Sequence, residues 1–186
     1  MVGVIHQLFL AFVEKNFGAP AAAEVKRRAG VAEGQDFRMD AAYSDDEWQR
    51  LLGAAVALSG LDRDQAELAF ARFCGQELSV RMAGFFKGCT TTREFLKLQP
   101  NIHSMMASSV ADVAAKRKIT DKFRLEELNG ETITHYVSTN RHCTLYRGLA
   151  EWVAEYYRER IEINEPRCQK RGDPECEIHV KHLGAR

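Results

Sequence analysis

The sequence from Tyr136 to Cys176 determines how we expect the rest of the chain to be organised. It begins Tyr136-Val137-Ser138-Thr139-Asn140-Arg141-His142-Cys143 and ends Glu165-Pro166-Arg167-Cys168-Gln169-Lys170-Arg171-Gly172-Asp173-Pro174-Glu175-Cys176. Three of the five cysteines fall in these two segments, and a glutamate stands three residues before the second of them. A helical pattern joins the segments, so this part of the chain predicts strands, a crossing helix and a cluster of thiols.

The composition predicts one cytoplasmic domain. The chain has 186 residues, enough for a substantial core, and its 26 basic residues balance its 26 acidic residues. Without a net charge, attraction to nucleic acid or to a membrane is not expected. No apolar run reaches the length of a membrane span, and Glu14, Lys15 and Asn16 stand where a signal peptide would be cleaved. In the cytoplasm thiols stay reduced, so clustered cysteines favour metal binding over disulfides.

The first half of the chain predicts helices only. Apolar residues recur at helical spacing, and Ser44 with Glu47 and Asp62 with Gln65 are typical of capping boxes at helix starts. Glycine and proline separate the helical segments. The predicted helices cover about 5–17, 20–28, 44–60, 62–78, 91–98 and 102–118.

After Lys118 the pattern changes to one of strands. Asn129-Gly130 is a strong signal for a two-residue hairpin turn, because it is flanked by segments of alternating polarity. The predicted strands cover 123–125, 132–137, 160–167 and 175–181, with a helix over 145–156. The fold class is therefore α+β, a helical N-terminal half packed on a four-stranded antiparallel sheet with a crossing helix. We expect one domain over 1–186, with lobes at 1–60 and 61–186.

The clustered thiols predict a closed metal site. Zinc prefers four tetrahedral ligands drawn from thiolate, imidazole and carboxylate. Cys168 and Cys176 flank a tight turn, Glu165 lies on the strand before it, and Cys143 begins the preceding helix. A site with four protein ligands is structural.

Alternatives to this ligand set stay open. The fourth place has two rival histidines, His142 and His179, and the cysteines could instead be small core residues that meet by chance. Against chance, Cys168 lies in a strongly polar segment where a core residue is not expected. We expect Cys74 and Cys89 to be ordinary core or surface residues.

The spacing of the cysteines resembles a known motif. Cys143, then Glu165-x-x-Cys168, then Gly172-Asp173-Pro174-x-Cys176 is similar to the vinyl-4-reductase-like (V4R) domain, which includes sensor domains of phenol-responsive activators. The resemblance is confined to the C-terminal part of the chain. It implies a structural zinc held by Cys143, Glu165, Cys168 and Cys176.

The chain as a whole resembles a second, related family. The residues that carry this resemblance are Met1-Val2-Gly3-Val4-Ile5-His6, Phe12-Val13, Phe17-Gly18, Tyr43-x-Asp45-Asp46, Phe95-Leu96 and Asn101-Ile102-His103. They look like the haem nitric-oxide/oxygen-binding (H-NOX) domain. The resemblance implies haem b, with His103 as the proximal iron ligand and a Tyr-x-Ser-x-Arg motif on the propionates, where Tyr136 and Ser138 fit. It also implies a distal lobe over 1–60 and a proximal lobe over 61–186.

The third position of that motif departs from the family pattern. Unbroken spacing from Ser138 to Gly148 puts Asn140 there, and Arg141 comes one residue late. A one-residue offset on a strand turns the side chain to the other face. Asn140 can donate a hydrogen bond, but it lacks the charged bidentate pairing of arginine. Judged from its residue type alone, His103 is more often a hydrogen-bonded core histidine than a ligand.

The expected distal side is apolar. Oxygen-binding family members carry a tyrosine at the position of Leu145, and here the tyrosine is the next residue, Tyr146. A distal face without a hydrogen-bond donor favours nitric oxide over oxygen. We expect Ile5, Leu145 and Met106 to contact the haem. The expected site is five-coordinate ferrous iron that takes up nitric oxide or carbon monoxide and forms no stable oxygen complex.

Two functions follow as hypotheses. The first is a haem-based gas sensor that signals to a partner such as a kinase or cyclase through movement of the His103 helix. The alternative is a haem-free sensor of an aromatic or lipid-like molecule, or an interaction module, with a structural zinc site. An enzyme is not expected, since the sequence has no phosphate-binding loop, nucleophile elbow or dinucleotide fingerprint.

Overall fold

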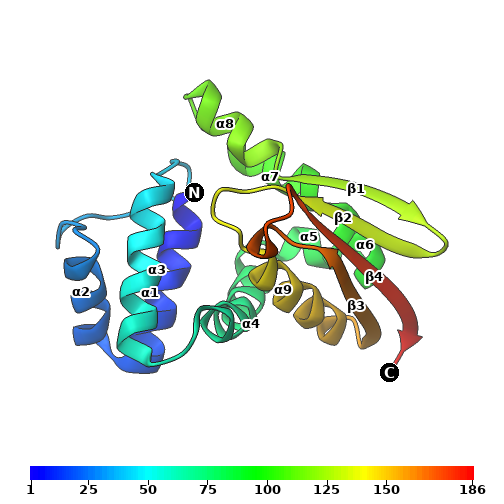
Figure 1. Ribbon diagram of the computed structural model, residues 1–186, viewed down its shortest axis with the longest axis horizontal. Coiled ribbons are helices and arrows are strands. Elements are labelled where there is room, and N and C mark those ends of the chain that lie inside the picture. Colours follow the sequence, from blue (N-terminus) through cyan, green and yellow to red (C-terminus); the bar gives the residue numbers. More distant parts are fainter.

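The computed structural model describes residues 1–186 as a helical half followed by a sheet crossed by a helix (Figure 1). The first helices are α1 (Gly3–Phe17), α2 (Ala19–Arg28) and α3 (Asp45–Ser59). The next are α4 (Arg63–Arg81), α5 (Ala83–Lys87), α6 (Thr92–Lys97), α7 (Gln99–Ala107) and α8 (Val113–Thr120). The remaining elements are β1 (Phe123–Leu128), β2 (Glu131–Tyr136), α9 (Cys143–Tyr156), β3 (Glu159–Arg167), the 3₁₀ turn η1 (Gln169–Arg171) and β4 (Cys176–Ala185). The predicted α+β class is confirmed.

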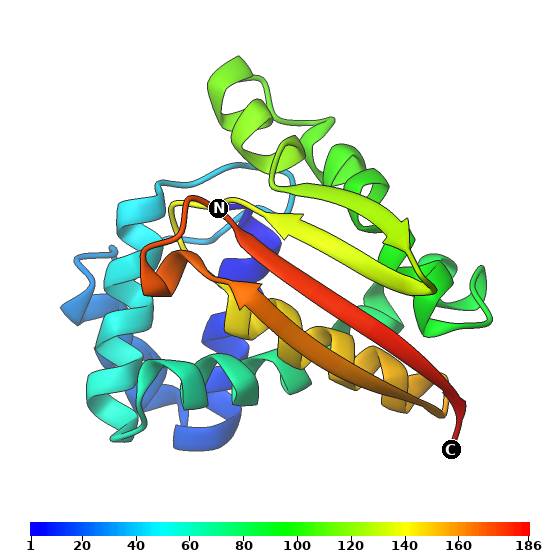
Figure 2. The ribbon, with the colours of Figure 1, turned by 45° about the vertical axis from the view of Figure 1, so that its right-hand side comes forward.

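The sheet is antiparallel with the strand order β1-β2-β4-β3. Asn129 and Gly130 both have positive φ angles, 53° and 84°, which the tight hairpin turn between β1 and β2 requires. Tyr136 at the end of β2 pairs with Cys176 at the start of β4. This register brings the segment that opens with Tyr136 beside the cysteine-containing turn. Helix α9 runs along one face of the sheet (Figure 2).

Three buried clusters form the core. The largest joins α1, α2 and α3 with α4, so the apolar packing continues across residue 60. Its largest fully buried side chains include Trp48, Phe9 and Phe70. A second cluster lies between α9 and the sheet, and a third between α9 and the helices α5 to α7. Helix α9 therefore separates the sheet from the helical part of the chain.

Helix α9 approaches α4 closely at two glycines. A Cβ atom at Gly75 would lie 2.2 Å from the ring of Trp152, and one at Gly148 would lie 2.8 Å from the Cβ of Ala71. Only residues without a side chain allow this distance between the two helices. The packing places α9 against the cavity described below.

The predicted start of α4 is confirmed, whereas that of α3 is only partly right. Asp62 and Gln65 exchange both hydrogen bonds of a capping box. Ser44 caps α3 by accepting a backbone N–H, but Glu47 does not return the bond. The Glu47 carboxylate lies instead 3.5 Å from Gln35 Nε2, and its other oxygen makes no hydrogen bond. A contact with a residue distant in sequence therefore replaces the capping bond of Glu47.

The predicted helix over 102–118 is wrong in its length, because the structure has two helices there. Helix α7 ends at Ala107, and α8 begins only after Asp112. The Asp112 carboxylate accepts the Ala115 N–H at 2.6 Å. This bond caps the start of α8 and takes the place of the backbone bond that a continuous helix would need. Helix α8 projects from the body of the molecule (Figure 1).

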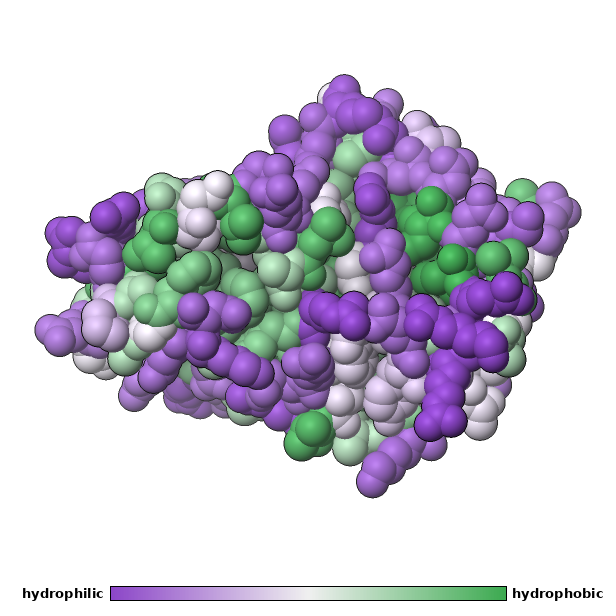
Figure 3. Space-filling view, turned by 90° about the horizontal axis from the view of Figure 1, so that it is seen from below, coloured by the Kyte–Doolittle hydropathy of each residue, from purple (hydrophilic) through white to green (hydrophobic).

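None of the helices combines the length and hydrophobicity needed to cross a bilayer. Seen from below, apolar side chains gather over the N-terminal helices on the left and in a second patch on the right, with hydrophilic residues between them (Figure 3). Exposed large apolar side chains include Phe17, Leu61 and Leu68.

Candidate functional site

An apolar cavity of about 130 Å³ lies between seven helices, α1 and α4 to α9. Hydrophobic residues provide 16 of its 20 lining residues, so an occupant would have to be mainly apolar. The polar groups in the wall are the side chains of Gln99, His103 and Lys122 and the hydroxyl of Tyr146. Helix α7 supplies His103 because Pro100 opens a helix whose apolar side, including Ile102, is buried against α9.

His103 presents one free ring nitrogen. Its Nδ1 lies 2.8 Å from the backbone carbonyl oxygen of Gln99, which accepts a hydrogen bond, and Nε2 makes no hydrogen bond. Burial, helped by the nearby charge of Lys122, outweighs the raising effect of the Gln99 bond and lowers the pKa of His103 to about 4. The ring is therefore neutral at pH 7, with its proton on Nδ1 and a lone pair on Nε2. This is the form in which histidine ligates a metal.

The expected contact residues lie in different places. Ile5 and Met106 line the cavity with His103, whereas Leu145 does not and packs on the N-terminal core. Tyr146 lines the cavity instead, and its hydroxyl lies 2.6 Å from the Thr134 hydroxyl. The rotation of α9 about its axis points Tyr146, and not Leu145, towards the cavity. The spacing of residues in the sequence does not give this rotation.

The residues of the Tyr-x-Ser motif serve the local structure. The Tyr136 hydroxyl accepts the His142 N–H at 3.1 Å, and Tyr136 is buried beside the cysteines. The Ser138 hydroxyl accepts the Asn140 N–H at 3.2 Å, and Ser138 lines the cleft described next. Tyr136 lines neither hollow.

Asn140 and Arg141 also lie outside the cavity. The Asn140 amide donates to Asp45 at 2.8 Å and accepts from Gln49 at 2.7 Å, so both ends of its side chain are used. Arg141 is exposed and has a positive φ of 51°. Neither residue supplies a free charge to the cavity.

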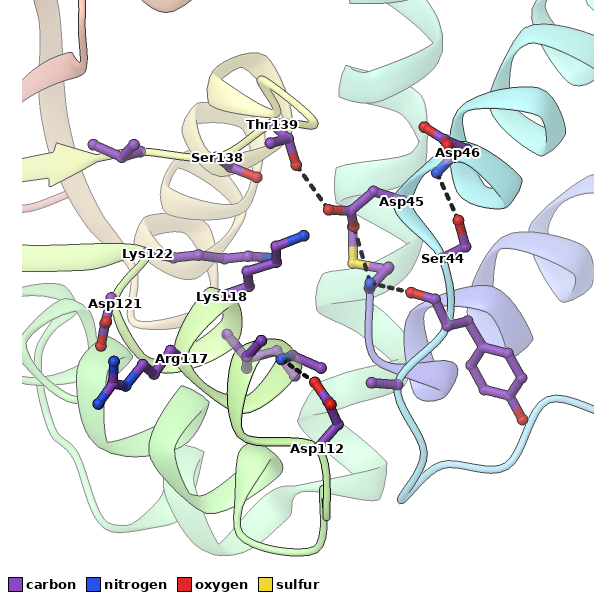
Figure 4. Close-up of a pocket in the computed structure, with 17 residues that line it drawn as sticks. Ser44, Asp45, Asp46, Asp112, Arg117, Lys118, Asp121, Lys122, Ser138 and Thr139 are labelled. Atoms are coloured by element: carbon purple, nitrogen blue, oxygen red, sulfur yellow. Dashed lines mark hydrogen bonds and ion pairs between the residues drawn. The ribbon is translucent and has the colours of Figure 1, made fainter.

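An open cleft of about 830 Å³ adjoins the cavity (Figure 4). One wall comes from the segment that starts α3, and the other from α8 and the turn after it. In Figure 4 the side chains of Lys118 and Lys122 extend towards Asp45, whereas Arg117 and Asp121 point away. The cavity and the cleft share Met1, Ile119 and Lys122 in their walls.

The four predicted zinc ligands come together at the start of α9. One ligand atom each from Cys143, Glu165, Cys168 and Cys176 lies within 4.8 Å of all the others. The Cys143 and Cys168 sulfurs are 3.4 Å apart. One carboxylate oxygen of Glu165 is buried without a partner, and the other accepts from Arg147 at 3.3 Å. A buried unpaired oxygen beside three buried thiols is the environment that a divalent cation would satisfy.

Local bonds hold this cluster in place. Asp173 accepts the Cys168 N–H at 2.7 Å, and the Gln169 N–H donates to the Cys176 sulfur at 3.2 Å. A hydrogen bond with Cys176, together with burial, raises the pKa of the Cys143 thiol. The Cys143 thiol is therefore protonated in the absence of a cation, and metal binding there would release its proton.

The rival ligands lie elsewhere. His142 accepts from the Trp48 indole at 2.5 Å and bonds Glu67 at 2.9 Å, so both ring nitrogens are engaged. His179 bridges two carboxylates on the other face of the sheet. The structure leaves neither ring nitrogen of these histidines for the thiol cluster.

A buried polar chain was missed by the sequence analysis. It runs from Trp48 through His142 and Glu67 to Lys170 in η1. Burial opposes ionisation of Glu67, but the bonds from His142 and Lys170 outweigh it and lower its pKa to about 2. The partners lie up to 103 residues apart in sequence, so no local pattern signals them.

Solved structures share this fold. An H-NOX protein from S. oneidensis in the Fe(II)NO ligation state superposes with a TM-score of 0.84 at 15% identity, covering 99% of this chain and 100% of that one. An oxygen-binding H-NOX domain related to soluble guanylate cyclases, in its oxygen complex, gives 0.78 at 17%, covering 100% and 96%. No curated protein matches the chain. The helical half, the crossed sheet and the enclosed histidine thus define an H-NOX fold.

The family follows from the sequence itself. The family described as haem-NO-binding matches residues 2–165. This protein belongs to the haem-NO-binding family.

The residues around the cavity fit haem in their chemistry. The ring needs apolar walls and an imidazole lone pair, which the cavity and His103 provide, and its carboxylates need a polar exit, which the cleft provides. The cavity alone is smaller than the roughly 300–1,000 Å³ typical of ligand pockets. Haem would therefore have to occupy part of the cleft as well as the cavity, and Met1, Ile119 and Lys122 lie between the two.

Proposed function

We propose that this protein is a haem-based gas sensor in which His103 is the iron ligand. The observation that carries the proposal is the neutral His103 ring, whose unbonded Nε2 belongs to a wall of an apolar cavity. Haem bound there supplies an iron that takes up nitric oxide or carbon monoxide. The lobe over 1–60 is proposed as the distal side and 61–186 as the proximal side.

The cavity wall supports a preference for nitric oxide over oxygen. Oxygen binding benefits from a hydrogen-bond donor in the cavity. The Tyr146 hydroxyl, which is the nearest candidate by sequence, is engaged with Thr134. Leu145 packs on the N-terminal core and offers no donor.

The position of α7 supports a route for signalling. The helix carries His103, whose ring lies 4.6 Å from that of Phe123 at the start of β1, and it is followed by the bend before α8. A displacement of His103 would therefore be passed to the sheet edge and to α8. We propose that the chain signals in this way to a cytoplasmic partner such as a kinase or cyclase and is not itself a catalyst.

We also propose a structural zinc at the thiol cluster. Cys143, Glu165, Cys168 and Cys176 would fill all four tetrahedral positions. The zinc would join α9 to the turn between β3 and β4. With no open position it would activate no water.

An absorption spectrum of protein expressed with haem supplied tests the sensor proposal. We expect a ferrous Soret band that His103→Gly abolishes and added imidazole restores. His179→Gly, a change on the outer face of the sheet, is the matched control and should leave the band unchanged. A band that survives His103→Gly would show that the iron has another ligand.

A haem-free sensor is the second candidate. Two observations favour it: the cavity is small, and Asn140 is committed to Asp45 and Gln49. Elemental analysis separates the candidates. About one zinc per chain with no iron after haem supply would reject the first function and support an aromatic or lipid-like ligand.

A further inference from the structure

The haem-binding motif of this chain lacks a charge for the haem carboxylates. Asn140 is uncharged and bound to Asp45 and Gln49, and Arg141 is exposed and has a left-handed backbone conformation. Ser138 is the one motif residue that lines the cleft. Two carboxylates leaving an apolar cavity are costly without a cation, because a buried charge needs a partner.

Lys122 lies where such a cation is needed. It follows α8 in the turn before β1 and is the only residue with a charged side chain in the walls of both the cavity and the cleft. Its charge acts on His103, which lines the cavity, and on the amino group of Met1, which lines both hollows. Lys122 makes no ion pair within 4.0 Å.

The other cations of the cleft are placed differently. The Met1 amino group already donates to the Tyr43 carbonyl at 2.8 Å and to Asp45 at 3.0 Å. Arg117 points away from the centre of the cleft, and Lys118 lines the cleft but not the cavity (Figure 4). Lys122 is therefore the cation that lines both the cavity and the cleft and has no partner in the protein.

The acidic groups of the cleft do not neutralise it. Asp45 is the nearest, and its oxygens already accept from Thr139, Asn140 and the Met1 amino group. Asp112 caps α8, and Asp121 points away from the cleft centre. The remaining carboxylate, Asp46, lies at the start of α3. A ligand carboxylate at Lys122 would meet a cation that the protein itself leaves unpaired.

We propose that Lys122 pairs with a carboxylate of the bound haem and so replaces the arginine missing from the motif. This inference rests on the proposed haem site. It assigns a positioning role, because the pair would orient the ring with its carboxylates in the cleft and its iron towards His103. An ion pair of this kind adds the attraction of a positive charge, which the uncharged Asn140 amide cannot supply.

Haemin titration of the haem-free protein tests the proposal. Lys122→Met should weaken haemin binding by about 10- to 100-fold, the loss of one charge-assisted bond. Lys116→Met, an exposed lysine of α8 that lines neither hollow, is the matched control and should stay within about threefold. Lys122→Arg should restore most of the affinity. Titration with haemin dimethyl ester, which has no free carboxylates, should show no difference between wild type and Lys122→Met.

Each result decides the proposal. Equal haemin affinity of Lys122→Met and wild type, in protein whose Soret band needs His103, would overturn the role of Lys122 and leave the sensor function standing. A wild-type chain with no His103-dependent band would overturn both. A loss that persists with the dimethyl ester would show that Lys122 only supports the fold. The melting temperature of haem-free Lys122→Met, expected to match wild type, identifies a folding defect.

Discussion

The thiol cluster and the His103 cavity differ in how they are built. Three of the four thiol-cluster ligands come from one segment, 165–176, and the fourth begins the helix before it. The cavity takes its wall from seven helices between residues 1 and 153. The geometry of the thiol cluster therefore depends mainly on one short turn, whereas the size of the cavity depends on how seven helices pack together. The predictions below test that difference.

The largest expected effect is on the thiol cluster. Cys176→Ala removes a fully buried ligand, so zinc should be lost and the free energy of unfolding should fall by at least about 3 kcal/mol. At about 2–4 °C per kcal/mol, the melting temperature should fall by roughly 10 °C. Cys89→Ala, outside the cluster, is the control and should keep its zinc. Full zinc content in Cys176→Ala would show that the cluster is not closed by this residue.

Acid should act on the helical lobe through His6. Burial lowers the pKa of His6 to about 4 in the folded chain, so the unfolded chain binds more protons between pH 6.5 and 4. Stability should therefore fall as the pH drops through this window, by up to roughly 3 kcal/mol. His6→Phe, which keeps an aromatic ring against Phe37, should lack this part of the loss. Urea unfolding at pH 7 and 4.5 measures it, and equal losses in both proteins would exclude His6.

The contact between α4 and α9 lies between the two sites. Gly75→Ala would place a methyl group in the Trp152 ring, within 2.2 Å of a ring atom, whereas a methyl group at Gly148 would lie 2.8 Å from Ala71 Cβ and 3.1 Å from the Leu68 side chain. We expect Gly75→Ala to cost about 1–3 kcal/mol and Gly148→Ala to cost less. Gly75 also lines the cavity, so Gly75→Ala should lower haemin affinity and leave the zinc content unchanged. If Gly148→Ala lost more stability than Gly75→Ala, then Gly148 and not Gly75 would make the tighter contact between the helices.

Local chemistry made parts of the molecule predictable. The Asp62 capping box, the Asn129-Gly130 hairpin and the thiol ligands near η1 depend on residues close in sequence, and each lies where the pattern indicates. The break at Asp112 was missed because an aspartate side chain can end a helix or sit on its surface, and periodicity does not distinguish the two.

The cavity was less predictable for a physical reason. His103, Ile5 and Met106 were expected near it, and they do line it. Leu145 was expected there by its distance from Gly148, but the rotation of α9 is set by packing against α4 and the sheet. The commitment of Asn140 to Asp45, 95 residues away, depends on the same tertiary packing. Such contacts follow only from the assembled helices.

The smallest expected effect concerns the gas rather than the fold. Tyr146→Phe removes a hydroxyl that bonds Thr134 and leaves the cavity wall otherwise intact. We expect a stability loss of about 1 kcal/mol and no change in the spectra of the haem-loaded protein with nitric oxide or carbon monoxide. Its spectrum in air should also match that of wild type, because the hydroxyl is already engaged.

Thr134→Val is the complementary change. Valine cannot bond the Tyr146 hydroxyl, whose donor is then buried beside the apolar cavity without a partner. An unpaired buried donor is costly, so the Tyr146 hydroxyl should donate to a gas ligand in the cavity instead. The haem-loaded variant should therefore show the spectrum of an oxygen complex in air, which wild type should not. Adding Tyr146→Phe to Thr134→Val should abolish that gain. If Thr134→Val behaves like wild type in air, the hydroxyl does not reach the gas, and the preference for nitric oxide depends on other parts of the cavity wall.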